Sequence, residues 1–155
     1  MLQAGMQVTR ARAAAIYRLR QQPPRLQGLV AEGMVERDVV GVEVPVREGL
    51  LGRTVDAGIA QIENDMLAAP IAEDQHLSFL GVQSVLAAPL VWGDTVQGVV
   101  AFFDQEGGGF SDESVNLVRV LSSQAARVVE ALAEEDKEGR EEPDGGEFVD
   151  LTDLL

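Results

Sequence analysis

His76 is the single histidine of the chain, and the chain contains no cysteine. A neutral imidazole is a common metal or haem ligand, but a bound metal needs further donor side chains around it. Nucleophilic catalysis needs a base placed beside a nucleophile, and one histidine of unknown surroundings does not establish such a set. We therefore predict that His76 has a structural role, that the chain uses no metal or cofactor, and that it is not an enzyme.

Two further observations exclude particular kinds of functional site. Without cysteine the chain has no disulfide, no thiolate metal site, no catalytic thiol and no thioether link to a chromophore. The run Gly107-Gly108-Gly109 lacks the Lys and the Ser or Thr that complete a phosphate-binding loop. We interpret this glycine run as a flexible link.

The net charge of −14 is distributed unevenly. Residues 1–40 have six Arg and three acids (+3), residues 41–133 four Arg and thirteen acids (−9), and residues 134–155 two basic residues and ten acids (−8). An acidic body repels phosphate backbones, so we expect no nucleic-acid partner. There is no apolar run of about 18 residues and no leader-like start, so we expect a cytoplasmic protein without a membrane partner.

Alternating residues predict a β-hairpin near the N-terminus. Residues 16–20 alternate apolar side chains with Arg18 and Arg20, which is typical of a half-buried strand with a solvated arginine face. Pro23-Pro24 ends this strand because proline cannot donate to a ladder. Residues 26–34 are the predicted partner strand.

The middle of the chain predicts short elements. Residues 49–58 have the pattern of a short helix that ends at Gly58, and residues 59–62 that of a short strand. A long connection follows, in which residues 73–80 are predicted to form a helical turn with its leucines facing inward. Residues 35–47 are rich in valine and interrupted by glycine and proline, so we expect a loop with some extended character.

The clearest prediction is a second hairpin. Residues 84–92 and 95–103 are apolar on both faces and are joined by Gly93-Asp94. Such a two-residue link is typical of a tight β-turn, because glycine adopts the positive φ that a primed turn requires. Strands that are apolar on both faces lie inside a sheet that is covered on both sides, so we expect these two strands to be central.

Ser111 is predicted to cap a long helix that runs to about Glu135, with acidic residues in its first turn. Apolar residues three and four positions apart predict a face that packs on the sheet. The apolar surface is wider than one stripe, and the candidate residues for a dimer contact on this helix are Leu117, Val120, Gln124 and Val128. They fit either packing on the sheet alone or a helix–helix contact in a twofold homodimer.

Residues 135–155 are predicted to form an acidic, flexible tail beyond a domain of residues 1–134, because residues 134–146 are charged and contain proline and glycine. The tail ends in five large apolar residues: Phe148, Val149, Leu151, Leu154 and Leu155. One hypothesis is that they bind a protein partner in a groove or at a sheet edge. The other is that they dock on this domain or stay in solvent.

Several strings together resemble the GAF domain family. They are Gly49-Leu50-Leu51-Gly52-Arg53 with Gly58, the strand ending in Asn64-Asp65, Leu80-Gly81-Val82-Gln83-Ser84-Val85-Leu86-Ala87-Ala88-Pro89-Leu90, Gly98-Val99-Val100 and Phe110-Ser111-Asp112-Glu113. The resemblance spans roughly residues 9–134. It implies an α+β fold with a central antiparallel sheet of five to six strands, terminal helices on one face, a long connecting segment on the other, and a shortened first helix.

GAF domains typically bind small molecules between the sheet and the long connection. The resemblance implies a ligand-binding site lined by Ile62, Asn64, Asp65, Leu77, Leu80, Ser84, Leu86 and Phe102. Such a site needs an apolar lining with a few polar groups. In the alternative interpretation, Asn64 and Asp65 only turn the chain and the apolar side chains fill the space as core.

Family members that bind cyclic nucleotides carry an Asn-Lys pair before the last helix. This chain has Asp104-Gln105 there, and a carboxylate repels a phosphate, so we expect no cyclic nucleotide. The resemblance implies a non-enzymatic regulatory or sensory module that acts as a homodimer and binds a small ligand or works in a signal-transduction assembly. The alternative is a docking adaptor with a vestigial pocket that binds a protein partner through its C-terminal segment. The sequence identifies no ligand.

Overall fold

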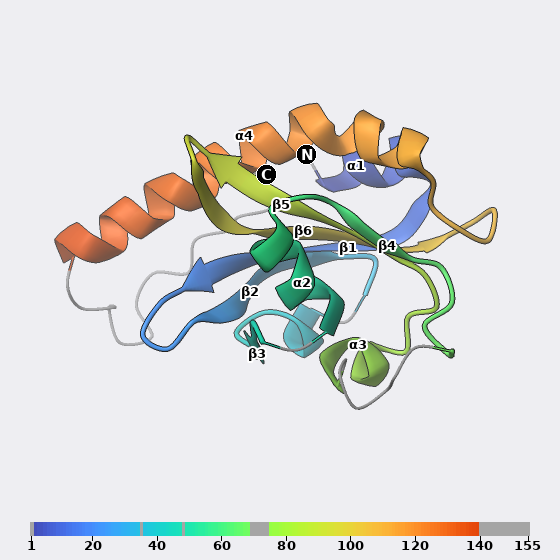
Figure 1. The fold of residues 1–155 in the computed structure, drawn as a ribbon, viewed down its shortest axis with the longest axis horizontal. Coiled ribbons are helices and arrows are strands. Elements are labelled where there is room, and N and C mark those ends of the chain that lie inside the picture. The colour runs from blue at the N-terminus through green and yellow to red at the C-terminus, as the bar shows by residue number, and fades with distance from the viewer. Residues whose placement is uncertain (1, 35, 48, 69–74, 140–155) are drawn as a thin grey trace.

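The computed structural model describes residues 2–34, 36–47, 49–68 and 75–139. It contains a six-stranded antiparallel sheet with the strand order β3-β2-β1-β6-β5-β4 (Figure 1). The strands are β1 (Ala11–Arg20), β2 (Arg25–Glu32), β3 (Glu43–Pro45), β4 (Gln61–Glu63), β5 (Val85–Trp92) and β6 (Thr95–Gln105). The number of strands and their antiparallel pairing confirm the predicted sheet.

The predicted central hairpin is present as β5 and β6. Trp92 pairs with Thr95 across the turn, and Gly93 has a φ of 64°. On its other side β6 pairs with β1, where Gly98 lies opposite Arg18. A Cβ atom at Gly98 would collide with the Tyr17 carbonyl oxygen, so the close approach of these two central strands requires glycine there.

The N-terminal hairpin of β1 and β2 is also confirmed, but the prediction of a solvated arginine face is wrong for Arg18. Only 9% of Arg18 is exposed. This residue lies on a central strand, opposite Gln27 of β2 on one side and Gly98 of β6 on the other. Arg20, nearer to the turn, keeps intermediate exposure.

Helices cover both faces of the sheet, as predicted. Helices α1 (Leu2–Thr9) and α4 (Asp112–Gly139) lie on one face, and α2 (Gly49–Ala57), α3 (Gln75–Leu80) and the 3₁₀ turn η1 (Glu36–Asp38) lie on the other (Figure 1). Neighbouring strand residues point to opposite faces, so the sheet has two buried clusters. Ile16 and Phe102 belong to the cluster under α4, whereas Tyr17 and Phe103 belong to the cluster on the α2 and α3 side.

Helix α4 begins where the sequence predicts, because the Ser111 N–H donates to Ser114 Oγ at 3.1 Å and the Ser111 carbonyl accepts from Val115 N–H. It continues to Gly139, past the predicted end near Glu135. Residues 134–138 include three Glu and one Lys, which favour helix, and glycine first appears at position 139. The predicted boundary at residue 134 therefore falls inside this helix.

The apolar C-terminal segment lies outside the described residues, so its binding role stays a prediction. It comprises Phe148, Val149, Leu151, Leu154 and Leu155. Of the helices in the described part of the chain, none has the length and apolar character needed to cross a membrane.

Candidate functional site

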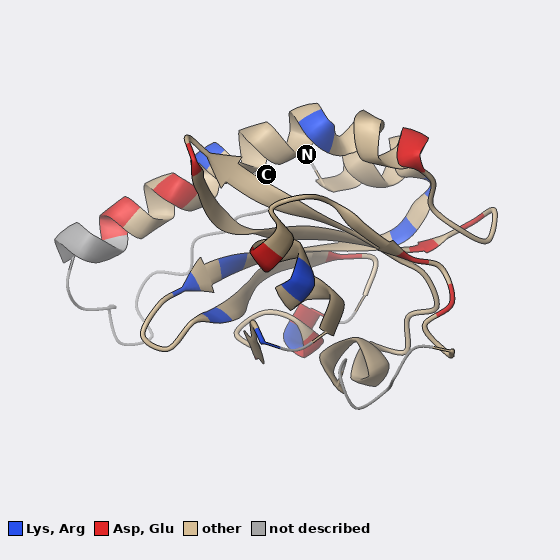
Figure 2. Cartoon of the chain, in the orientation of Figure 1, with Lys and Arg blue, Asp and Glu red and all other residues tan. Residues whose placement is uncertain are grey.

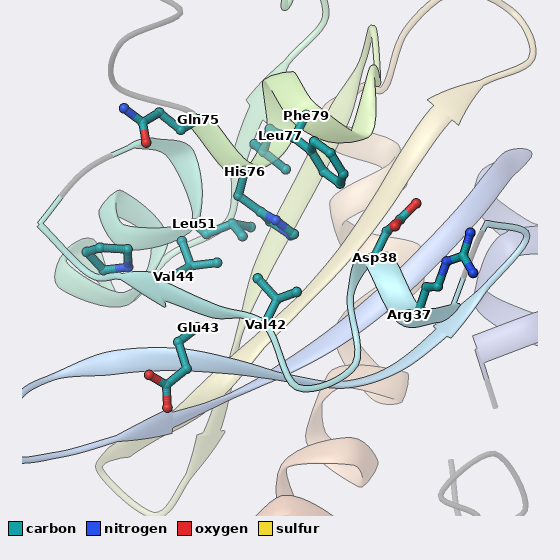
Figure 3. A pocket seen from close by; sticks show the side chains of 11 residues that line it. Arg37, Asp38, Val42, Glu43, Val44, Leu51, Gln75, His76, Leu77 and Phe79 are labelled. Carbon is teal, nitrogen blue, oxygen red and sulfur yellow. The ribbon is translucent and has the colours of Figure 1, made fainter.

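A cavity of about 500 Å³ lies on the α2 and α3 side of the sheet (Figure 3). Its walls come from η1, from β3 and the residues before it, from α2 and from α3. The lining residues are Arg37, Asp38, Val42, Glu43, Val44, Pro45, Leu51, Gln75, His76, Leu77 and Phe79. An apolar wall with a few polar groups is the usual composition of a small-molecule site.

His76 is the polar group that connects this cavity to the sheet. Its Nε2 atom lies 2.7 Å from the Tyr17 hydroxyl oxygen, and the two rings meet edge to face, with centroids 5.5 Å apart and planes at 87°. Tyr17 is fully buried on the central strand β1. The cavity wall therefore has a direct hydrogen bond to the central strand β1.

Burial sets the protonation of both groups. It raises the pKa of Tyr17 above its usual value, so the phenol keeps its proton. It lowers the pKa of His76, so the imidazole is neutral at neutral pH. We therefore assign the Tyr17 hydroxyl as the donor and His76 Nε2 as the acceptor, which leaves the imidazole proton on Nδ1.

Leu77 anchors the helix that carries His76. Its side chain is 1% exposed and packs in the cluster that contains Tyr17, while Leu80 packs against the same cluster with intermediate exposure. The helix ends at Leu80, and the following residue, Gly81, closes the last turn with a φ of 73° and an N–H bond to the Leu77 carbonyl. The predicted helical turn with inward leucines is confirmed.

The charged residues at the cavity differ in their partners. The Arg25 Nε atom donates to Glu43 Oε1 at 3.1 Å, so Glu43 is neutralised by an arginine of β2. Arg37 is exposed, and Asp38 has intermediate exposure. Neither forms an ion pair or a side-chain hydrogen bond with the residues that the structure describes.

The structure divides the apolar residues of the predicted ligand site between the two faces of the sheet. Leu77 lines the cavity, and Leu80 packs on the same side. Leu86 and Phe102 pair across β5 and β6, and both are buried under α4, with Ile62 packed against that cluster. These three residues are therefore on the opposite face from the cavity, because strand residues of one parity share one face.

The polar residues of the predicted site bind the backbone. Asn64 donates from Nδ2 to the Phe110 carbonyl at 3.0 Å and accepts at Oδ1 from the Phe110 N–H at 2.8 Å. Ser84 Oγ accepts from the Gln105 N–H at 3.1 Å, and Asp65 is exposed. Asn64 thus ties the start of the long connection to the segment between β6 and α4, and Ser84 ties its end to the last residue of β6. The bonds of Asn64 agree with its alternative interpretation as a structural residue.

Sequence reasoning missed most of the cavity wall. The valine-rich stretch that contains Val42 and Val44 follows no helical or strand period, so nothing assigned its side chains to a face. His76 has the structural contact that the sequence analysis predicts, and it also lines the cavity. Among the described residues, no group of three or more His, Asp or Glu is placed to hold a metal ion.

The chain belongs to the GAF domain family. The family model described as "GAF domain" matches residues 1–130. GAF domains are sensory and regulatory modules that bind ligands. A search of curated proteins finds no match.

Solved structures with this fold come from several bacteria. The GAF domain of an Acinetobacter phosphoenolpyruvate-protein phosphotransferase is 18% identical with a TM-score of 0.68, covering 88% of this chain and 79% of that chain. GAF-B of DevS from Mycobacterium smegmatis is 17% identical with a TM-score of 0.64 and coverages of 88% and 92%. Staphylococcus aureus NreA, mutated in its nitrate binding site, is 20% identical with a TM-score of 0.56 and coverages of 68% and 80%. At these identities the likeness concerns the fold alone.

Proposed function

We propose that this chain is a non-enzymatic, cytoplasmic regulatory GAF module that binds a small ligand in the cavity beside His76. The observation that carries the proposal is the His76–Tyr17 hydrogen bond at the wall of a cavity of about 500 Å³. That volume lies within the ordinary range of small-molecule sites. Because Tyr17 belongs to β1, a ligand that moves His76 acts directly on the central strand.

The supporting features are a preformed wall and neutral hydrogen-bonding groups. Val42 and Leu51 supply apolar surface, and the imidazole and the Gln75 amide supply polar groups. Polar groups and apolar walls together give a ligand both orientation and affinity. The structurally similar NreA protein has a nitrate binding site, which agrees with a ligand-binding role for this fold but does not define the ligand of this chain.

The test is a thermal-shift screen of the full chain with amino acids, nucleotides, 2-oxo acids and small ammonium compounds. We expect at least one compound to raise Tm, because a ligand that binds only the folded state stabilises it. Val42→Trp fills the cavity and should remove that shift. Ile59→Trp, a large change at a 62% exposed residue that lies outside both the cavity and the proposed dimer surface, should leave it intact. A screen without any stabilising compound, or a shift that survives Val42→Trp, contradicts the proposal.

We also propose that the module acts as a homodimer through α4. Leu117 and Val120 are 46% and 67% exposed, and Gln124 is exposed beside them on the same helix. Val128 is half-buried and packs partly against the core of its own chain. Val8 of α1, on the same side of the sheet, is 46% exposed. Two copies that pack these surfaces together would remove this apolar area from water.

A further inference from the structure

We infer that the ligand of the cavity is a small organic cation, an ammonium compound with an apolar part, held by the carboxylate of Asp38. This inference rests on the proposed ligand-binding function of the cavity. Asp38 lines the cavity from η1 with intermediate exposure. Within the described part of the chain its carboxylate has no ion-pair or hydrogen-bond partner. A partly desolvated carboxylate is more stable with a cation beside it.

The segment that carries Asp38 is held firmly on the sheet. Gly28 of β2 donates to the Val42 carbonyl at 2.9 Å and accepts from the Gly41 N–H at 2.9 Å. The next residue, Val39, is fully buried, and its carbonyl lies so close to Gly28 that no Cβ atom fits between them. The backbone next to Asp38 is therefore fixed before any ligand binds, which lowers the entropic cost of binding.

The neighbouring charges leave Asp38 as the available anion. Glu43 is already paired with Arg25. Arg37 also borders the cavity, but its side chain is exposed and makes no ion pair with Asp38. Figure 3 shows Asp38 between His76 and Arg37, with the guanidinium group on the side away from His76. Among the lining residues that the structure describes, Asp38 is therefore the carboxylate without a charged partner, and the nearby His76 is neutral.

Phe79 adds an aromatic surface suited to a cation. Its ring lines the cavity and is 71% exposed, and Figure 3 shows it above His76 on the side of Asp38. Ammonium groups bind favourably over aromatic faces, whereas an anion gains nothing from the face of a phenyl ring. The apolar wall of Val42 and Leu51 is available for the rest of the ligand.

The charge of the whole chain acts in the same direction. The net charge is −14, and Asp and Glu residues occur on several elements of the described fold (Figure 2). Such a field raises the local concentration of cations and lowers that of anions. The local carboxylate, the aromatic ring and the overall field therefore all select the same sign of ligand charge.

The experiment compares charged and neutral molecules of the same shape by calorimetric titration of the full chain. The pairs are choline with 3,3-dimethylbutan-1-ol, and benzylamine with benzyl alcohol, and sodium nitrate serves as the anion probe. We expect at least one ammonium compound to bind about tenfold more tightly than its neutral partner, which corresponds to ~1.4 kcal/mol. Asp38→Asn should remove this preference, and Glu36→Gln, on the exposed side of the same turn, should preserve it.

The outcomes separate this inference from the proposed function. Equal binding of both members of each pair, binding of nitrate alone, or a preference that survives Asp38→Asn overturns the cation inference. If the Val42→Trp variant no longer binds one of those molecules, its binding to the wild type still supports a ligand cavity. If no ammonium compound binds, the cation inference is wrong. The proposed ligand-binding function is contradicted by a different result, namely a complete thermal-shift screen in which no compound raises Tm.

Discussion

The Tyr17 hydroxyl and His76 Nε2 are 2.7 Å apart, and this hydrogen bond joins a central strand to the helix at the cavity. Tyr17→Phe removes the donor and leaves His76 Nε2 without its partner. We expect the free energy of unfolding to fall by about 0.5–1.5 kcal/mol, the usual net contribution of one hydrogen bond, because His76 is only partly buried. Urea denaturation of the variant and the wild type measures this difference. A change within experimental error would show that the bond contributes nothing to stability.

The lowered pKa of His76 predicts that acid destabilises the fold. The unfolded imidazole takes up a proton near its ordinary value of 6.5, while burial keeps the folded one neutral to lower pH. The stabilisation that comes from neutral His76 is therefore fully present above about pH 6.5. It is lost as the pH falls from there toward the pKa of His76 in the folded protein. His76→Gln should flatten this part of the curve. Urea midpoints for both proteins at about pH 7.5 and about pH 5.5 test the prediction. An equal drop in midpoint for the variant and the wild type would contradict it.

Asn64 is predicted to stabilise the start of α4, although it lies far away in sequence. Asn64→Ala removes both side-chain hydrogen bonds to the Phe110 backbone. We expect a loss of about 1–2 kcal/mol, measured by thermal or urea unfolding. Asp65→Ala is the matched control, because Asp65 is exposed and no side-chain bond of it is described. Equal effects of the two variants would contradict a specific role for Asn64.

Gly28 is predicted to tolerate no side chain. A Cβ atom there would overlap the Val39 carbonyl, so Gly28→Ala must push Val39, and with it the end of η1, away from β2. We expect destabilisation of more than about 2 kcal/mol, in the range of overpacking in a close-packed interior. Denaturation measures the loss, and Gln27→Ala on the same strand is a control with intermediate exposure. A Gly28→Ala protein as stable as the control would show that η1 moves freely.

The proposed dimer predicts a change of mass in solution. Replacing Leu117 and Val120 by Glu places two like charges on the exposed surface of α4 in each copy. We expect sedimentation equilibrium to report a dimer for the wild type and a monomer for the double variant, with unchanged helix content by circular dichroism. Gln3→Glu on α1 is an exposed control. A wild type that is monomeric at all accessible concentrations contradicts the proposal.

The sequence predicts the scaffold well because strong local signals specify it. The link Gly93-Asp94 defines the central hairpin, and Ser111 marks the start of the last helix. Strands that are apolar on both faces predict a sheet covered on both sides. The same property does not show which face each side chain occupies. The family resemblance places Leu86 and Phe102 at the ligand site, whereas the structure has them under α4.

The cavity is harder to predict because tertiary contacts create it. Asp38 and Val42 belong to a segment without a regular period, and hydrogen bonds to Gly28 hold it in place. His76 meets Tyr17 across 59 positions of sequence, and no local pattern reports such a contact. Arg18 has the charge of a surface residue, yet its neighbours on both sides cover it.

The wall of the cavity comes almost entirely from η1, β3, α2 and α3, and the central strands β1 and β6 contribute none of its lining residues. The residues of the proposed ligand site and those of the central strands β1 and β6 are thus different parts of the chain. Side chains such as Asp38, Val42 and Phe79 are open to redesign for a new specificity while the hydrogen-bonded ladder between β1 and β6 stays untouched. This division makes the domain a suitable starting point for an engineered biosensor.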